Sequence, residues 1–418
     1  MSLSIHAVRP YHPEDREEAE RIWREVKWLV DDNREPLRLL LDGGRATVGT
    51  QRGSVECLAI TTPAKFRYLG TDLSMSAVMA VTTSLVARKQ GLAGQTTAAA
   101  VRESAEAGAT LSALGIFDQG YYDRLGFGTM PYTRRLLFDP AQLMVPYPKR
   151  PPHRFDASHS ELLHRSRLRR ARGHGSVNLL SPNNSRAEAV EVKSSGGLGY
   201  YRSDGEIGHH LYGHLKEENG PYRIWWAAYE NYDELRDLLG VLRSLADQIH
   251  LVDMMEPRGV VLQDFLKQPF KFRRSTEKGK YEHTIITAAA SQLRILDIPA
   301  AVAAMGPSEP SPKPSSEPLE FNLLIDDPIE RQLPEDGRWR GCSGSYVVQL
   351  GADPKAEPGD GKSLPKVRMS IGGFTQLWSG ARKVAHLSLR GELDAESDVR
   401  DELSRRFRVP EPDFEWLF

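Results

Sequence analysis

The chain has 418 residues, which is too long for one ordinary domain, so we expect two or three domains. Hydrophobic residues make up 40% and charged residues 27%, values that are typical of folded, water-soluble proteins. The formal net charge of −1 argues against a general electrostatic attraction to nucleic acids or to anionic membranes.

The cysteines and the first residues indicate the compartment. Cys57 and Cys342 lie far apart and fit neither a metal-ligand nor a redox spacing. Residues 1–6 lack the basic and apolar regions of a signal peptide. The longest apolar runs fall short of the ~18 residues that a membrane-spanning helix needs. We therefore expect a cytoplasmic protein that is not inserted in a membrane.

The first third of the chain is predicted to mix helices and strands. Residues 13–30 have acidic residues in the first turn and apolar residues at helical spacing, which predicts an amphipathic helix. Short runs of β-type residues follow near 45–51, 54–61 and 76–85. A helix is predicted over 92–107, and a buried strand over 111–117.

The turn before the predicted helix 92–107 is the first informative motif. Residues 88–93 read Arg-Lys-Gln-Gly-Leu-Ala, and the glycine allows close approach of a ligand to the backbone. A turn that opens onto a helix N-terminus presents N–H groups that can bind a pyrophosphate. We call residues 88–94 the phosphate cradle. The glycine patterns of a dinucleotide-binding fold and of a P-loop are absent.

The second informative motif is residues 119–128, which read Gln-Gly-Tyr-Tyr-Asp-Arg-Leu-Gly-Phe-Gly. Tyr122 follows a predicted strand, so its phenol could return to the cleft that holds the phosphate cradle. On the sequence alone, a hydrogen bond across a turn is the favoured role of a tyrosine close to glycine, and Tyr121 is expected to point the other way. A phosphate cradle with a positioned phenol suggests group transfer from a nucleotide-bearing cofactor.

Two further regions follow the first. Four prolines between residues 146 and 153 predict a surface connection. After it, a strand, a helix and a strand are predicted over 223–229, 232–248 and 249–254. The cradle motif does not recur there, so this region is expected to repeat the shape of the first without its cofactor site.

A third region is expected to begin at residue 293. It contains predicted loops over 306–318 and 351–366 and predicted helices over 371–382 and 393–407. Three of the last five residues are aromatic, so we expect the C-terminus to pack rather than fray.

Two residue clusters have a functional and a structural interpretation. Five arginines between residues 165 and 172 could bind nucleic acid, but a solvated helix face is favoured because no aromatic residues are interleaved with them. His209, His210 and His214 could bind a metal ion. Adjacent residues of a strand face opposite sides, so at most two of these histidines converge, and we expect no metal site.

With these motifs in place, the chain resembles the GNAT superfamily of acetyl-CoA-dependent N-acetyltransferases. Its motif R/Q-x-x-G-x-G/A is matched by Arg88, Gly91 and Ala93. More narrowly, the chain is similar to the enhanced intracellular survival (Eis) family. Residues 120–128 resemble the family segment G-x-Y-x-R-F-G-[FY]-G, with leucine in place of its phenylalanine. Residues 293–300 resemble the start of the family's C-terminal domain, and the chain ends on an aromatic residue at the expected length.

The resemblance implies an α/β (α+β) fold of three domains. Two tandem GNAT-like domains would occupy residues 1–140 and 141–290, the first with the acetyl-CoA site and the second without a cofactor motif. A sterol-carrier-protein-like domain would occupy residues 291–418. The resemblance also implies a homo-hexamer that acetylates primary amines, either on aminoglycosides or on lysine side chains.

The resemblance further implies roles for individual residues. Tyr122 would be the general acid for the departing thiolate, and the C-terminal carboxylate of Phe418 would be the general base for the amine. Trp28 and Asp31 lie in the first-helix region that lines the amine pocket of the family. The acetyl-CoA contacts would come from Val81, Thr83, Arg88, Lys89, Gln90, Gly91, Ala93 and Gly94.

The chain departs from the family at a few positions. Gln90 and Gly94 stand in the cradle where relatives are more basic, and Leu417 stands where an acidic residue would help to bind polycationic amines. An alternative function is a non-catalytic protein that binds a small molecule or lipid and carries a vestigial GNAT domain. The intact cradle and Tyr122 disfavour this alternative.

Overall fold

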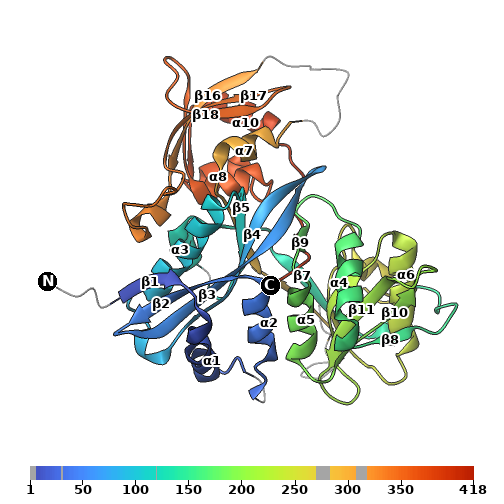
Figure 1. The fold of residues 1–418 in the computed structure, drawn as a ribbon. Helices are drawn as coiled ribbons and strands as arrows, with labels where there is room; N and C mark the ends of the chain where they lie inside the picture. Colours follow the sequence, from blue (N-terminus) through green and yellow to red (C-terminus); the bar gives the residue numbers. More distant parts are fainter. Residues whose placement is uncertain (1–5, 30–31, 119, 270–282, 307–317) are drawn as a thin grey trace.

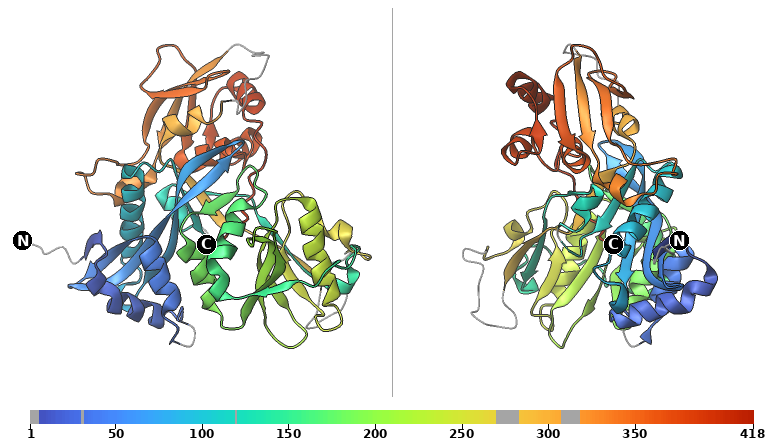
Figure 2. Two further views of the ribbon diagram at one scale, coloured as in Figure 1. Left: turned by 45° about the vertical axis from the view of Figure 1, so that its right-hand side comes forward. Right: turned by 90° about the vertical axis from the view of Figure 1, so that its left-hand side faces the viewer.

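The computed structural model describes residues 6–29, 32–118, 120–269, 283–306 and 318–418. Three sheets organise this part of the chain into three regions (Figure 1, Figure 2). Asp31, Gln119 and most of the predicted loop 306–318 lie outside the described residues.

The first sheet has the strand order β1-β2-β3-β4-β5-β15-β6, and β9 pairs with β3. Strands β2, β3 and β4 form an antiparallel meander, whereas β4 and β5 are parallel. The strands are β1 (His6–Pro10), β2 (Arg45–Gln51), β3 (Ser54–Tyr68), β4 (Thr71–Thr83), β5 (Leu111–Gly115), β6 (Gly128–Thr129), β9 (Val177–Leu179) and β15 (Ser291–Ile295).

Three helices accompany the first sheet. Helix α3 (Leu92–Glu106) connects β4 to β5, which confirms the predicted strand–turn–helix–strand unit. Helices α1 (Arg16–Glu25) and α2 (Glu35–Gly43) follow β1 and precede β2 in the chain. The predicted helix 13–30 is shorter than expected, because it starts as a 3₁₀ turn at Pro13 and Lys27 takes a left-handed conformation (φ 62°).

The second sheet has the order β14-β7-β13-β12-β11-β10-β8. It repeats the plan of the first: β10, β11 and β12 are antiparallel, and helix α6 (Tyr232–Ser244) leads from β12 to a parallel β13. The other helices are α4 (Ser160–Arg169) and α5 (Pro182–Glu191). The strands are β7 (Thr133–Phe138), β8 (His153–Phe155), β10 (Ser195–Tyr201), β11 (Ile207–Leu215), β12 (Tyr222–Ala228), β13 (Val252–Met255) and β14 (Thr284–Ala288).

The two sheets exchange strands across the expected domain boundaries. Strand β7 precedes residue 140 but pairs with β13 and β14 of the second sheet. Strand β15 follows residue 290 but pairs with β5 and β6 of the first sheet. Each exchanged strand covers the open edge of the parallel pair that it joins, and an uncovered edge would leave backbone groups unpaired. The sheets therefore do not divide at residues 140 and 290.

The third sheet has the order β18-β17-β16-β19-β20. It differs from expectation in two places. Strand β18 lies within the predicted loop 351–366. The predicted helix 393–407 begins with strand β20, because Leu393 is buried and pairs with Met369. The strands are β16 (Leu319–Asp326), β17 (Gly344–Leu350), β18 (Lys355–Pro358), β19 (Lys366–Ser370) and β20 (Leu393–Asp394). The helices are α7 (Ile298–Ala303), α8 (Ile371–Trp378), α9 (Val384–Leu389) and α10 (Ser397–Arg406).

A continuous apolar core joins the first and third regions. The ring of Trp378 stacks on that of Tyr68 at 4.2 Å, and the Tyr68 hydroxyl donates to the Trp378 carbonyl oxygen. The Trp378 indole N–H donates to the Ala301 carbonyl oxygen at 2.7 Å. Within the described residues, no helix combines the length and the apolar character that crossing a membrane requires.

Candidate active site

Strand β4 continues to Thr83 beyond its ladder with β5, and we call the place where this pairing has stopped the opening of the first sheet. The two strands pair only from Met75 to Val78 on β4. On the other side of β4, the ladder with β3 passes from Met79 to Thr82 and skips Ala80 and Val81. Ala80 has φ 54°, which marks a bulge. The backbone of Val81 therefore lies outside both ladders, where it can pair with an extended amide chain such as pantetheine.

The phosphate cradle lies beyond the end of β4, where Thr83 is the last strand residue. Lys89 and Gly91 both take left-handed conformations, with φ 64° and 84°, so the chain turns sharply into α3. No side chain caps α3 in the described structure, and its first backbone bond runs from Gln95 N–H to the Gly91 oxygen at 3.2 Å. The preceding N–H groups, of residues 92–94, have no acceptor within the helix, and the turn before them (residues 88–91) is exposed, although Leu92 and Gly94 are buried.

The side chain of Gln90 forms hydrogen bonds within the protein. Its side-chain amide donates to the Val86 oxygen at 2.8 Å, and its side-chain oxygen accepts from Gln51 at 2.6 Å. The Gln90 side chain therefore connects the cradle turn to Val86 and to Gln51 of β2. Arg88 and Lys89 are exposed and supply the positive charge of the cradle.

Tyr122 begins a 3₁₀ turn (Tyr122–Leu125) and is 6% exposed. Burial raises the pKa of its phenol, and nearby Tyr121, Cys57 and Asp118 raise the pKa further by disfavouring a phenolate. The phenol is therefore protonated at neutral pH and can act as a proton donor.

Tyr121 does not point away from Tyr122, as the sequence suggested. The two rings meet edge to face at 4.9 Å, and the Tyr121 hydroxyl lies 3.8 Å from the position of a Cβ atom built on Gly94. Tyr121 is the N-cap of the 3₁₀ turn that Tyr122 begins, and in such a turn neighbouring side chains do not alternate between opposite faces as they do in a strand. A second residue missed by the sequence reasoning, Gln332 of the third region, also approaches Gly94, with its side-chain oxygen 3.3 Å from the same position.

The chain end reaches the first sheet, as the packed aromatic residues suggested. The C-terminus lies between the first and second regions (Figure 1). The carboxyl group of Phe418 lies directly against Gly115, the last residue of β5, and a side chain at this position would collide with its oxygen. Because β5 pairs with β4 only as far as Leu114, the carboxyl group lies next to the point where the two strands stop pairing.

The structure also places the remaining residues of interest. Trp28 is 38% exposed and packs edge-on against Trp23 at 5.4 Å, while Asp31 is outside the described residues.

Among the three histidines, His210 is buried and accepts from the Trp226 indole at 2.9 Å, whereas His209 faces Glu234. The described residues contain no cluster of histidine, cysteine or carboxylate side chains suited to a metal ion.

The arginine cluster is only in part the solvated helix face that was predicted: Arg165 is exposed, and Arg169 and Arg172 are partly exposed. Arg167 and Arg170 are 4% and 7% exposed. They are buried because the C-terminal residues and Glu188 supply carboxylates and aromatic faces for their guanidinium groups. No local signal in residues 165–172 could show this, since the partners lie far away in the sequence.

Residues 7–130 match the family model of the acetyltransferase (GNAT) domain. Among curated proteins, none matches the chain.

Three solved structures share the fold along nearly the whole chain. A probable N-acyltransferase from Enterococcus faecalis V583 has 17% identity and a TM-score of 0.77, covering 99% of this chain and 100% of its own. A GCN5-related N-acetyltransferase from Kribbella flavida has 18% identity and a TM-score of 0.69, covering 99% of each chain. Eis1 from Mycobacterium abscessus has 15% identity and a TM-score of 0.71, covering 99% of this chain and 100% of its own.

These likenesses show the fold, and the match over residues 7–130 identifies the domain that carries the cradle and Tyr122. The chain thus contains a GNAT acetyltransferase domain and is an acetyl-CoA-dependent N-acetyltransferase.

Proposed function

We propose that the protein transfers the acetyl group of acetyl-CoA to a primary amine of an aminoglycoside-like or lysine-like acceptor. Tyr122 is the general acid and the carboxylate of Phe418 is the general base. The observation that carries this proposal is the position of the Phe418 carboxyl group against Gly115, at the mouth of the opening between β4 and β5.

The features of the first region fit acetyl-CoA as the donor. The uncapped N–H groups at the start of α3, with Arg88 and Lys89 beside them, would hold the pyrophosphate. The bulged backbone at Val81, together with Thr83 at the strand end, would hold the pantetheine arm. Gly91, Ala93 and Gly94 keep this surface free of large side chains. When bound there, acetyl-CoA supplies an activated acetyl group at the opening.

Two proton transfers remain for the chain's own residues. The amine attacks only when neutral, so a carboxylate must take its proton directly or through a water molecule, and the terminus of Phe418 can do so. The departing sulfur leaves as a thiolate, and the protonated phenol of Tyr122 can donate a proton to it. The phenol of Tyr122 is protonated at neutral pH, so the proton is present before the transfer.

The wider resemblance to the Eis family extends the proposal. We propose that the second region is a GNAT-like domain without acetyl-CoA and that the third is a sterol-carrier-protein-like domain. We also propose that the protein forms a homo-hexamer in the cytoplasm. The repeated meander and parallel pair of the second sheet support the first of these statements. Size-exclusion chromatography with light scattering tests the assembly.

The activity is tested by measuring CoA release over a panel of amines. The panel contains aminoglycosides, lysine-bearing peptides and small polyamines. We expect CoA release that depends on the amine, with one new acetamide in the product mass spectrum for each amine modified. If acetyl-CoA binds but no amine stimulates CoA release, the alternative of a vestigial, ligand-binding protein replaces this proposal.

A further inference from the structure

We propose that the second region acts as a clamp for the C-terminal tail (residues 411–418), and that Arg167 and Arg170 are positioning residues for the Phe418 carboxylate. The inference rests on the proposed role of that carboxylate. It gives the second region a function in the reaction although this region lacks the cradle motif.

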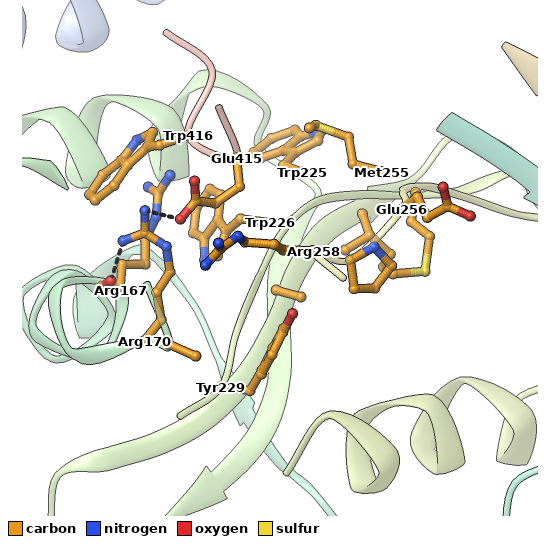
Figure 3. Close-up of a pocket in the computed structure, with 15 residues that line it drawn as sticks. Arg167, Arg170, Trp225, Trp226, Tyr229, Met255, Glu256, Arg258, Glu415 and Trp416 are labelled. Atoms are coloured by element: carbon orange, nitrogen blue, oxygen red, sulfur yellow. Dashed lines mark hydrogen bonds and ion pairs between the residues drawn. The ribbon is translucent and has the colours of Figure 1, made fainter. Parts of the chain in front are cut away.

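The second sheet has an opening like that of the first. Strands β12 and β13 pair only at Tyr222 and Arg223 and then diverge. A pocket of about 70 Å³ lies where they separate, and Glu415 and Trp416 of the tail form one of its walls (Figure 3). Part of the chain itself therefore lies beside the second opening, whereas the first opening is proposed to take acetyl-CoA.

The helix that follows β12 is unsuited to a phosphate. The side chain of Asn231 accepts from Glu234 N–H at 3.0 Å and caps α6. The Glu234 carboxylate accepts from the Glu230 N–H at 2.6 Å, and Asp233 adds a further negative charge in the first turn. In a phosphate cradle, the N–H groups of the helix N-terminus bind the phosphate. At α6 the Asn231 side chain occupies one of these groups, and the acidic residues of the first turn repel an anion.

Arg167 holds Trp416. Its guanidinium carbon lies 3.6 Å from the centroid of the Trp416 ring and 4.1 Å from that of the Trp226 ring. Glu188 pairs with Arg167 and also accepts from the Trp416 indole N–H at 3.1 Å. The tail tryptophan is thus fixed by a cation against its face and by a carboxylate at its edge.

Arg170 holds the neighbouring Glu415. It donates to the Glu415 carboxylate at 2.8 Å, and to Asn178 and the Val177 carbonyl oxygen at 2.6 Å each. The guanidinium group of Arg170, at the end of α4, is therefore fixed by β9 of the first sheet before it meets the tail. Figure 3 shows both arginines beside Glu415 and Trp416.

The rest of the tail is extended and packed at alternate residues. Phe414 lies 5.8 Å from the ring of Phe66, and Asp413 N–H donates to the His174 oxygen at 3.0 Å. Gly175 packs against the tail backbone at Pro412, where a Cβ atom would lie 2.6 Å from the Pro412 Cα. An extended chain advances about 3.4 Å per residue, so fixing Trp416 leaves little freedom for the carboxyl group two residues later.

The test compares full-length variants by acetyl transfer and by the rate at which carboxypeptidase removes Phe418. Trp416→Ala removes the ring that Arg167 holds but keeps the terminal carboxylate. Trp416→Phe retains a ring. The matched control is Arg243→Lys, because Arg243 also lies over an aromatic ring, that of Tyr147 at 4.2 Å, and neither residue lines the pocket beside the tail.

We expect Trp416→Ala to lower kcat by about 10- to 100-fold, since a displacement of about 1 Å of a reacting group has effects of this size. The KM for acetyl-CoA stays unchanged, and carboxypeptidase removes Phe418 faster than in the wild type. Trp416→Phe restores most of kcat, and Arg167→Lys, which keeps the charge but loses the planar group, gives an intermediate result. Arg243→Lys behaves as wild type in both assays.

The clamp is overturned if Trp416→Ala keeps wild-type kcat and wild-type resistance to carboxypeptidase. It is also overturned if kcat falls with an equal rise in the KM for acetyl-CoA, because this would report general loosening of the fold. If deletion of Phe418 leaves kcat unchanged while Trp416→Ala still exposes the tail, the general-base assignment fails and the docking of the tail stands.

Discussion

The carboxyl group of Phe418 touches Gly115, so the last residue of the chain meets the last residue of β5. This contact connects the C-terminal tail, held by the second region, with the opening in the first sheet. It brings the chain end to the strand that precedes Tyr122, as the proposed role of the carboxylate requires.

Replacing Gly115 by alanine tests this contact. The added Cβ atom would collide with the Phe418 carboxyl oxygen, and an extended tail anchored at Trp416 cannot move away freely. We expect kcat to fall by about 10- to 100-fold, with the KM for acetyl-CoA unchanged. Steady-state kinetics measures both constants, and wild-type kcat in Gly115→Ala would contradict the proposed position of the base.

Replacing Tyr122 by phenylalanine tests the general acid. The ring still fills its buried site, so the fold should be kept, whereas kcat should fall by about 100-fold or more. Tyr121→Phe is the matched control, because its hydroxyl approaches Gly94 of the cradle. We expect this control to change the KM for acetyl-CoA and to leave kcat near the wild-type value. Equal kcat values for the two variants would argue against Tyr122 as the acid.

The raised pKa of Tyr122 also predicts the alkaline side of the pH profile. A general acid is active only while protonated, so activity is lost as the pH rises through its pKa. Because burial raises this pKa above the ordinary value of about 10, kcat should show no loss due to Tyr122 below about pH 10. A descending limb near neutral pH that disappears in Tyr122→Phe would contradict the expectation.

Replacing Gly91 by alanine tests the cradle. Gly91 has φ 84° with open space around it, so alanine is disfavoured by the backbone conformation alone. A strain of about 1–2 kcal/mol should shift the turn and raise the KM for acetyl-CoA about tenfold. Gly53→Ala is the control, since Gly53 has φ 88° and equally open space but lies in the turn between β2 and β3. Similar KM values in both variants would exclude the cradle as the phosphate site.

Asp413 makes the docking of the tail depend on pH. Burial, followed by repulsion from Glu415, raises its pKa from 3.8 to about 6, although Arg258 and Arg170 oppose the shift. The folded chain then binds a proton more readily than the unfolded chain, so stability falls as the pH rises from about 4 to about 6. Above this range the ionised carboxylate costs up to about 3 kcal/mol.

We therefore expect Asp413→Asn to raise the Tm by about 2–4 °C or more at pH 8 and to change it little near pH 4. Differential scanning calorimetry at both pH values measures the difference. Asp233→Asn is the control, because its side chain is 88% exposed. An increase in Tm at pH 4 that equals the increase in Tm at pH 8 would contradict the raised pKa of Asp413.

Local patterns predicted the part of the site that is local in sequence. The turn at Gly91 and the helix after it lie in one strand–turn–helix–strand unit, and Tyr122 follows its last strand; glycine and apolar spacing are informative there. The exchange of β7 and β15 could not be predicted in this way, because it depends on which open sheet edge a strand covers. The burial of Arg167 depends on Trp416, which is distant in the sequence, and a run of arginines looks the same whether solvated or stacked.

The most direct test of the account compares deletion of Phe418 with Phe418→Leu. The deletion withdraws the terminal carboxylate by one residue, whereas Phe418→Leu keeps it in place and changes only the side chain. We predict that the deletion lowers kcat by about 100-fold or more, while Phe418→Leu remains within a few-fold of the wild type. Equal turnover by the wild type and the deletion variant would contradict the carboxylate of Phe418 as the general base.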